Sequence, residues 1–219
     1  MVIYLGVKTK NFRFRKPMNK SLFSVLILLL FYTCEPSPAL PITQLDEIKS
    51  LKTDDQKRAY LEGIYEADQK VRNTEKEVSI IGQYGYRSDQ HMTYIEDQWR
   101  QDEQNIVKIE SYLAEYGHPE FISLGEVATK TPWLVIHHSA DADLRLKYFG
   151  TLYSAYLRKN IDYSALALYL ESTYRMLHDE EIRIEYPYTT NDRIEFLINQ
   201  LNLTQEKVEV EKRLVLLNE

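Results

Sequence analysis

The chain has 219 residues, with 27 Lys and Arg, 33 Asp and Glu, 17 Tyr, one Cys, 7 Gly and 7 Pro. This composition excludes collagen-like, disulfide-rich and disordered proteins, and a mean hydropathy of -0.43 is typical of a soluble domain. Residues 34–219 hold 21 Lys and Arg against 33 Asp and Glu, a net charge of -12, which argues against nucleic-acid binding.

The first 33 residues have the layout of a secretory signal peptide. They contain six basic residues and no acid, followed by the apolar run Leu22–Phe31, which is too short to span a bilayer. Translation from Met18 would give a shorter signal peptide, and the sequence alone leaves both starts open. We therefore expect an exported protein.

The only cysteine, Cys34, directly follows this segment and precedes a Pro-rich stretch. The segment resembles a bacterial lipoprotein signal, which implies that Cys34 becomes the first mature residue and carries a diacylglycerol. Phe31, Tyr32 and Thr33 differ from the usual Leu, small, small pattern, so an incidental cysteine after a plain signal peptide or an uncleaved anchor remains the alternative. The prediction is a lipid anchor at Cys34, a flexible spacer over 34–44, and a location in the cell envelope on the periplasmic face or the cell surface.

From residue 45 to residue 219 the apolar spacing predicts a single all-α domain. We expect a bundle or an irregular array of six to eight helices, with a tetratricopeptide-like array as a competitor. The expected helices cover 45–80 with a break near Thr53, 89–116, 131–138, 141–159, 163–177, 191–201 and 204–217. Residues 120–130 read as a loop, and the alternation over 182–186 is the only strand-like piece.

Two pairs of polar residues fall on helix faces that the neighbouring apolar residues mark as inward. Asp68 and Arg72 are four residues apart, and Asp102 and Asn105 are three apart, so each pair shares a face. Asp102 interrupts an apolar stripe that includes Trp99. Buried charges need partners, so these residues either lock the helices in register or form a site.

His137 and His138 end the apolar run that begins at Trp133. Adjacent helical positions point in different directions, so we expect one of the two to face inward, as a hydrogen-bonded core residue or as a base. Adjacent histidines chelate a metal poorly on a helix. The chain lacks a Gly-rich phosphate loop, a Gly-x-Ser-x-Gly elbow and a His-Glu-x-x-His motif, and no metal or cofactor is predicted.

A series of short motifs resembles an uncharacterised bacterial family, a domain of unknown function found in many Bacteroidetes-type lipoproteins, whose pattern reads DQxxR, DxxN, GxP, VG, VIQHSD, LxDR and QxYGTQ. The matching residues here are Asp68-Gln69-x-x-Arg72, Asp102-x-x-Asn105, Tyr116-Gly117-x-Pro119, Gly125, Trp133–Ser139, Lys147-Tyr148, Leu152 and Ala167-Leu168. The resemblance covers about Leu61–Leu203.

The resemblance implies that the polar signature of the family is carried here by Asp68, Gln69, Arg72, Asp102, Asn105 and His138. The last two motifs are absent, because Ser172-Thr173 stands near the expected Asp-Arg and residues 182–186 stand in place of Gln-x-Tyr-Gly-Thr. His137 replaces the usual Gln. If the family is enzymatic, this member has kept the fold and lost part of the signature.

Three functions follow as hypotheses. The leading one is a lipid-anchored module that binds a protein partner or a small polar ligand in a cleft near the six signature residues. The second is a hydrolase in which His138 acts as base, Asp102 orients it and Arg72 holds an anionic or carbonyl group. For that enzyme the three side chains should converge on an open pocket. The third is a structural envelope protein with no cleft and an exposed Tyr-rich patch.

Overall fold

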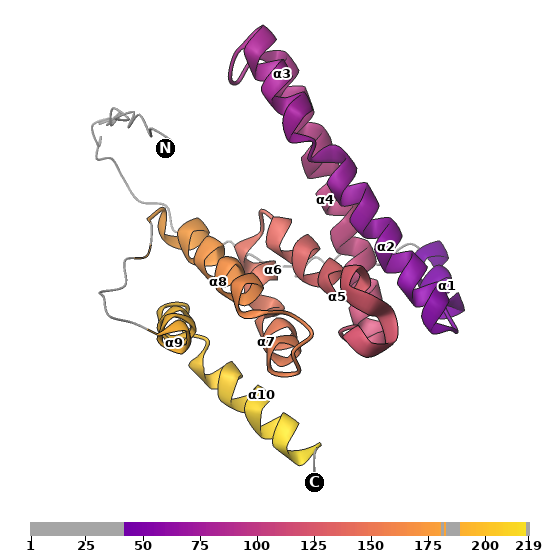
Figure 1. Cartoon of the computed structure of the whole chain (residues 1–219), viewed down its shortest axis with the longest axis vertical. Helices are drawn as coiled ribbons and strands as arrows, with labels where there is room; N and C mark the ends of the chain where they lie inside the picture. The colour runs from indigo at the N-terminus through magenta and orange to yellow at the C-terminus, as the bar shows by residue number, and fades with distance from the viewer. Residues whose placement is uncertain (1–41, 181, 183–188, 218–219) are drawn as a thin grey trace, which may run out of the picture. The chain divides into compact units, whose positions relative to one another are not determined.

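The computed structural model describes residues 42–180, 182 and 189–217, and in these ranges every regular element is a helix (Figure 1). The predicted all-α class is confirmed. The signal peptide, Cys34 and most of the 182–186 segment lie outside the described residues. The first helix begins at Ile42, three residues inside the expected spacer.

The helices fall into two groups along the chain. The first group contains α1 (Ile42–Ser50), α2 (Asp54–Val71), α3 (Thr74–Tyr84), α4 (Asp89–Tyr116) and α5 (Phe121–His138). The second contains α6 (Ala142–Lys147), α7 (Phe149–Leu157), α8 (Tyr163–His178), α9 (Thr190–Gln200) and α10 (Thr204–Leu216).

The helices outnumber the six to eight expected, because two predicted helices are broken. The break at Thr53 was predicted, and its side chain caps α2 in a capping box with Gln56. A second break follows Arg72, where the Asn73 side chain accepts a hydrogen bond from the Lys76 N–H and starts α3. The predicted helix 141–159 is divided at Tyr148, whose ψ of 3° lies outside the helical range.

The prediction of a loop over 120–130 is wrong, because α5 begins at Phe121. Gly125 is the one non-helical position within α5, with φ 80° and ψ 178°, a conformation that only glycine adopts readily. Pro132 lies in the interior of α5 instead of in a first turn. Sequence reasoning took Gly125 and Pro132 as boundaries, whereas here they mark a kink and an interior position.

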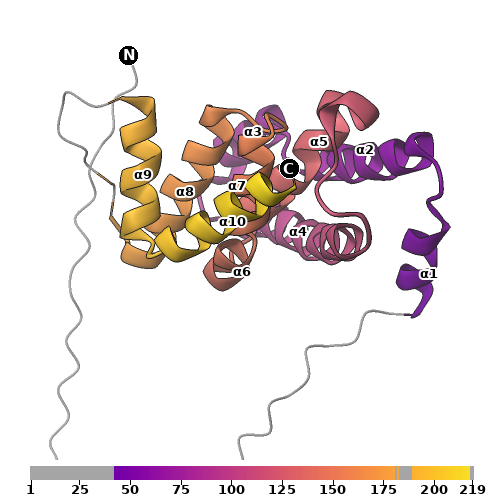
Figure 2. The same ribbon diagram turned by 90° about the horizontal axis from the view of Figure 1, so that it is seen from below.

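The first group of helices is arranged around α2 and α4 (Figures 1 and 2). α2 packs mainly on α5 and also on α4, while α4 further contacts α1, α3 and α5. The Tyr116 hydroxyl at the end of α4 donates to the carbonyls of Ile48 and Leu51 at 2.7 and 2.9 Å, which fixes α1. The result is that α2, α4 and α5 lie side by side where the signature residues occur.

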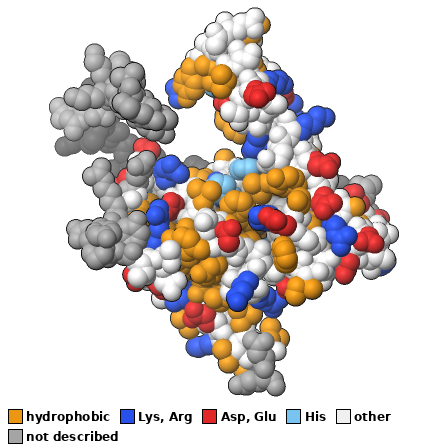
Figure 3. All heavy atoms as spheres, viewed as in Figure 1, with side chains coloured by type: hydrophobic (Ala, Val, Ile, Leu, Met, Phe, Trp, Pro, Cys, Tyr) orange, Lys and Arg blue, Asp and Glu red, His pale blue; other side chains and the backbone are white. Residues whose placement is uncertain are grey.

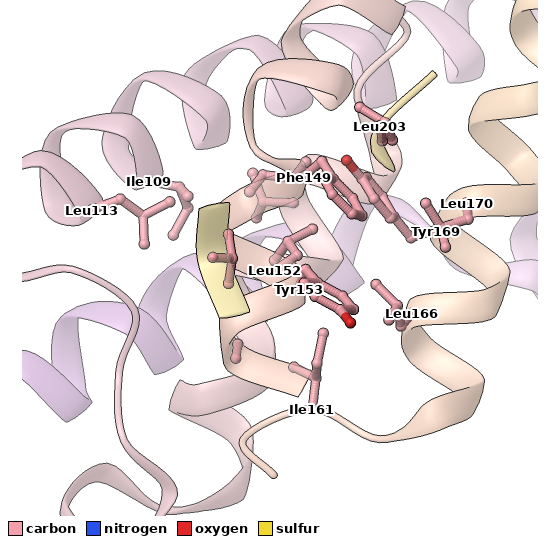
Figure 4. Packing of buried hydrophobic residues seen from close by; sticks show 14 of the residues in the cluster. Ile109, Leu113, Phe149, Leu152, Tyr153, Ile161, Leu166, Tyr169, Leu170 and Leu203 are labelled. Carbon is pink, nitrogen blue, oxygen red and sulfur yellow. The ribbon is translucent and has the colours of Figure 1, made fainter. Parts of the chain in front are cut away.

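The second group is built around α8, which packs on α9, α6, α7 and α5, while α10 packs on α7 and α9. Buried apolar side chains of α4, α7 and α8 meet in the core, as Figure 4 shows for Ile109, Phe149, Leu152, Leu166 and Leu170. All five are fully buried. Their burial supplies the main driving force for folding in this part of the chain.

Candidate functional site

A chain of polar side chains joins α2, α4 and α5, and Asp68 is at its centre. Asp68 is fully buried, and its Oδ1 accepts from Arg72 and from His138 Nδ1, both at 2.9 Å. Arg72 then donates to Asp102 Oδ1 at 2.5 Å. The side chains of Arg72, His138 and Asp102 are 19%, 20% and 12% exposed, so the cluster reaches the surface on one side.

Helix spacing explains why these residues meet. Asp68 and Arg72 are one turn apart on α2, while Asp102 is on α4 and His138 is the last residue of α5. The side chains of His138, Asp102 and Arg72 come together as the enzyme hypothesis required, but of the three only Asp102 lines the open groove described below, so the convergence on an open pocket is met only in part. Its assumed pairing is corrected, however, because Asp68 and not Asp102 orients the imidazole.

The electrostatics of the cluster follow from burial and from the bridging guanidinium. Arg72 contacts both carboxylates, so a single cation serves two acids. The pKa of Asp102 is raised by burial, and the hydrogen bond and charge of Arg72 oppose this shift only in part. Such a site keeps its charges close together in a poorly solvated environment, where each contact is stronger than in water.

Gln69 and Asn105 have different places relative to the cluster. Gln69 belongs to it, because its Nε2 donates to Asp68 Oδ2 at 2.9 Å. Asn105 is fully buried one turn beyond Asp102, but its Oδ1 accepts from Gln101 at 2.9 Å, and its Nδ2 has no hydrogen-bond partner in the described part of the chain. Of the six signature residues, five are therefore in one hydrogen-bonded network and Asn105 is beside it.

Both histidines at the end of α5 are partly buried, which corrects the expectation that only one faces inward. Their ring centroids are 5.7 Å apart. The His137 ring stacks on Trp133, and its Nδ1 lies 3.2 Å from the Ser172 hydroxyl. Burial, followed by the charge of Arg145, lowers the pKa of His137 to about 4, so this ring is neutral at pH 7.

Arg145 is a buried residue that sequence reasoning missed. Its guanidinium donates to the carbonyls of His137 and Ser139, at the end of α5, and to the Ser172 hydroxyl. These carbonyls form the negative end of the helix, which suits a cation. Ser172 therefore contacts both Arg145 and His137. In the sequence, the only indication that Arg145 is buried is its position between two leucines, Leu144 and Leu146.

A groove of about 700 Å³ opens beside Asp102. Its apolar lining comes from α4, α6 and the connection before α6, and three carboxylates line it with no basic residue. The lining residues are Trp99, Asp102, Glu103, Ile106, Val107, Ser139, Ala140, Asp141 and Leu144. Trp99, expected in the buried stripe of 89–116, is 52% exposed and forms part of this groove. Figure 3 shows a face of the molecule where apolar side chains gather beside histidine and charged side chains.

The cluster also has the residue types of a metal site. Asp68, Asp102 and His138 each offer a ligand atom, and these atoms lie within 4.8 Å of one another. Arg72 is bonded to both carboxylates, so a divalent cation would have to displace a guanidinium. The residues therefore already hold a cation of their own, and we assign no metal to them.

Comparison of the chain with protein-family models, with curated proteins and with solved structures gives no match. Among the residues that the structure describes, no helix is both long enough and apolar enough to span a membrane.

Proposed function

We propose that this protein is a lipid-anchored module of the cell envelope that binds a small amphipathic cation in the groove beside Asp102. The observation that carries the proposal is the composition of that groove, in which Trp99, Ile106 and Leu144 accompany three carboxylates. Apolar walls favour burial of a ring or an alkyl group, and an indole face also attracts a cation. The net charge of -12 over residues 34–219 favours the same kind of ligand.

The polar cluster gives this groove a fixed wall. Asp102 lines the groove with its carboxylate held by Arg72, and Arg72 is held in turn by the buried Asp68. A carboxylate that is already oriented loses little freedom on binding, which favours affinity. The groove also counts against the hypothesis of a structural protein without a cleft.

A thermal-shift series tests the proposal with phenethylamine as the probe. A ligand that binds only the folded state raises the melting temperature, so we expect a rise with phenethylamine and none with 2-phenylethanol or 3-phenylpropionate. The Asp102→Asn and Trp99→Ala variants should lose the rise. Asp97→Asn, an exposed acid on the same helix that pairs with Arg100, is the matched control and should keep it. An equal rise with all three compounds, or no rise with any, contradicts the proposal.

The anchor is tested separately on Cys34. We expect wild-type protein to take up labelled fatty acid and to fractionate with membranes, and Cys34→Ser to do neither. Membrane fractionation of Cys34→Ser at the wild-type level would contradict a lipid anchor and favour an uncleaved apolar segment.

One observation favours a hydrolase as a second candidate. Asp68 accepts from His138 Nδ1, and His138 Nε2 has no hydrogen-bond partner among the described residues, which is the arrangement of an oriented general base. A panel of chromogenic esters and phosphates tests it with His138→Ala, and with the exposed His178→Ala as control. Turnover lost only in His138→Ala supports the candidate, whereas turnover no faster than in buffer excludes it for these substrates.

A further inference from the structure

A second cavity, of about 540 Å³, lies where the connection between α4 and α5 meets α7 and α10. It shares no lining residue with the groove beside Asp102. Its volume lies in the range of small-molecule sites, roughly 300–1,000 Å³. Three observations indicate which ligand chemistry would suit it.

The first observation is an unsatisfied acceptor on His118, which lines the cavity. His118 Nδ1 lies 3.0 Å from the Pro119 carbonyl, so Nδ1 carries the proton and Nε2 presents a lone pair. Nε2 is buried and has no partner among the described residues. Burial lowers the pKa of His118 to about 4, which keeps the ring neutral at pH 7. Leaving a buried acceptor without a donor destabilises the folded protein, so a ligand that places a hydrogen-bond donor at Nε2 is favoured.

The second observation is an available cation. Of the basic residues that line the cavity, Lys147 pairs with Glu110 and Arg158 pairs with Glu120. Arg213, on α10, makes one hydrogen bond, from Nε to the Glu209 carbonyl, and its terminal nitrogens have no hydrogen-bond or ion-pair partner in the part of the chain that the structure describes, although its charge acts on the Glu206 carboxylate of the same lining. A guanidinium with two free nitrogens suits a carboxylate, which it can bind in a bidentate manner.

The third observation is a close contact between Gly150 and Glu206 in the lining of the cavity, which requires a residue without a Cβ at position 150. Gly150 lines the cavity, and its N–H donates to Glu206 Oε1 at 3.1 Å. A Cβ at Gly150 would lie 2.6 Å from that oxygen, so the Glu206 carboxylate reaches this position only because residue 150 is glycine. Ser154 and Thr151 add hydroxyl groups to the same lining.

From these groups we propose that the cavity binds a small carboxylate that also carries hydroxyl donors, with the carboxylate on Arg213 and a hydroxyl toward His118. A sugar acid has this chemistry. This cavity is separate from the groove beside Asp102, so the proposal for it does not depend on the function proposed above.

The test is calorimetric titration of the full chain with D-glucuronate. D-glucose lacks the carboxylate and cyclohexanecarboxylate lacks the donors, so both should bind at least about tenfold more weakly, as should glucuronate to Arg213→Ala. Arg213 is exposed, so this variant should fold normally. Arg100→Ala, an exposed arginine on α4, is the matched control and should bind like the wild type.

His118 is tested with two substitutions that separate its nitrogens. His118→Asn keeps a donor near the Pro119 carbonyl and removes Nε2, so glucuronate binding should fall by about tenfold. His118→Gln keeps a polar group near Nε2 and should bind more tightly than His118→Asn. Absence of saturation at about 10 mM glucuronate, or binding that neither Arg213→Ala nor His118→Asn weakens, overturns the proposal and leaves an ordered water as the partner of Nε2.

Discussion

Both halves of the molecule contribute fully buried apolar side chains to one core, but the first half adds a buried cluster of ion pairs to it. Where α7 packs on α8, the contacts are made by fully buried apolar side chains such as Phe149 and Leu152. Where α2, α4 and α5 meet, one fully buried acid, Asp68, connects all three through Arg72 and His138. Apolar burial has no direction, whereas ion pairs fix orientation. The junction of α2, α4 and α5 therefore holds the side chains of Asp68, Arg72 and His138 in fixed orientations.

The largest effect is expected in the apolar region. Phe149→Ala should lower the free energy of unfolding by about 3–5 kcal/mol, because it removes a fully buried ring and leaves a cavity. Urea denaturation followed by circular dichroism measures it. A loss below about 1 kcal/mol would mean that the region repacks freely and that the contrast is not real.

In the polar region, Asp68→Ala should cost about 3 kcal/mol, because Arg72 and His138 lose a shared acceptor while remaining partly buried. Asp68→Asn keeps an oxygen in the same place and should cost clearly less. The same denaturation experiment compares the two variants. Equal losses would show that the charge and hydrogen bonds of Asp68 contribute little beyond its volume.

The pH dependence of stability tests the two neutral histidines. His118 and His137 have folded-state pKa values of about 4, whereas an unfolded histidine titrates near 6.5. Between these values the unfolded state binds more protons, so stability should fall as pH falls from about 6.5 to about 4, by up to about 3 kcal/mol for each histidine.

The raised pKa of Asp102 acts in the opposite direction and partly offsets this loss. Denaturation midpoints at pH 7 and pH 5 measure the net effect. His118→Asn, which cannot be protonated, should show a smaller loss than the wild type. An identical loss in the variant would assign the acid sensitivity to other groups.

The smallest effect is expected at a helix end. Thr53→Ala removes the side chain that accepts from the Gln56 N–H and should cost about 1 kcal/mol. Thermal denaturation measures it. Thr53→Ser keeps the hydroxyl and should retain most of the stability. If Thr53→Ser is as unstable as Thr53→Ala, the lost helix cap is not the cause of the destabilisation.

The helical class could be predicted from the sequence because apolar spacing reports which face of a helix is buried. The pairing of Asp68 and Arg72 could be predicted for the same reason, since both are on one helix. The Asp68 to His138 bond could not, because it joins residues 70 positions apart and depends on how α5 packs on α2. The start of α5 was missed because Gly125, which usually ends a helix, here forms a kink within one.

The groove was also beyond sequence reasoning. Trp99 is in phase with the apolar stripe of α4, yet it is 52% exposed. The apolar periodicity of a helix predicts which of its sides is buried. It does not predict over what length of the helix the neighbouring helices cover that side. The same limit applies to His118, whose free acceptor depends on the packing of the connection between α4 and α5.

The most direct test of the account follows the two tryptophans by NMR. The chain has two, Trp99 in the groove and Trp133, whose indole N–H donates to the Ala165 carbonyl at 2.8 Å. In a titration of the ¹⁵N-labelled protein with phenethylamine, the indole signal of Trp99, assigned with Trp99→Phe, should shift and saturate while that of Trp133 stays fixed. A fixed Trp99 signal, or equal shifts of both signals, would contradict the assignment of the groove as the binding site.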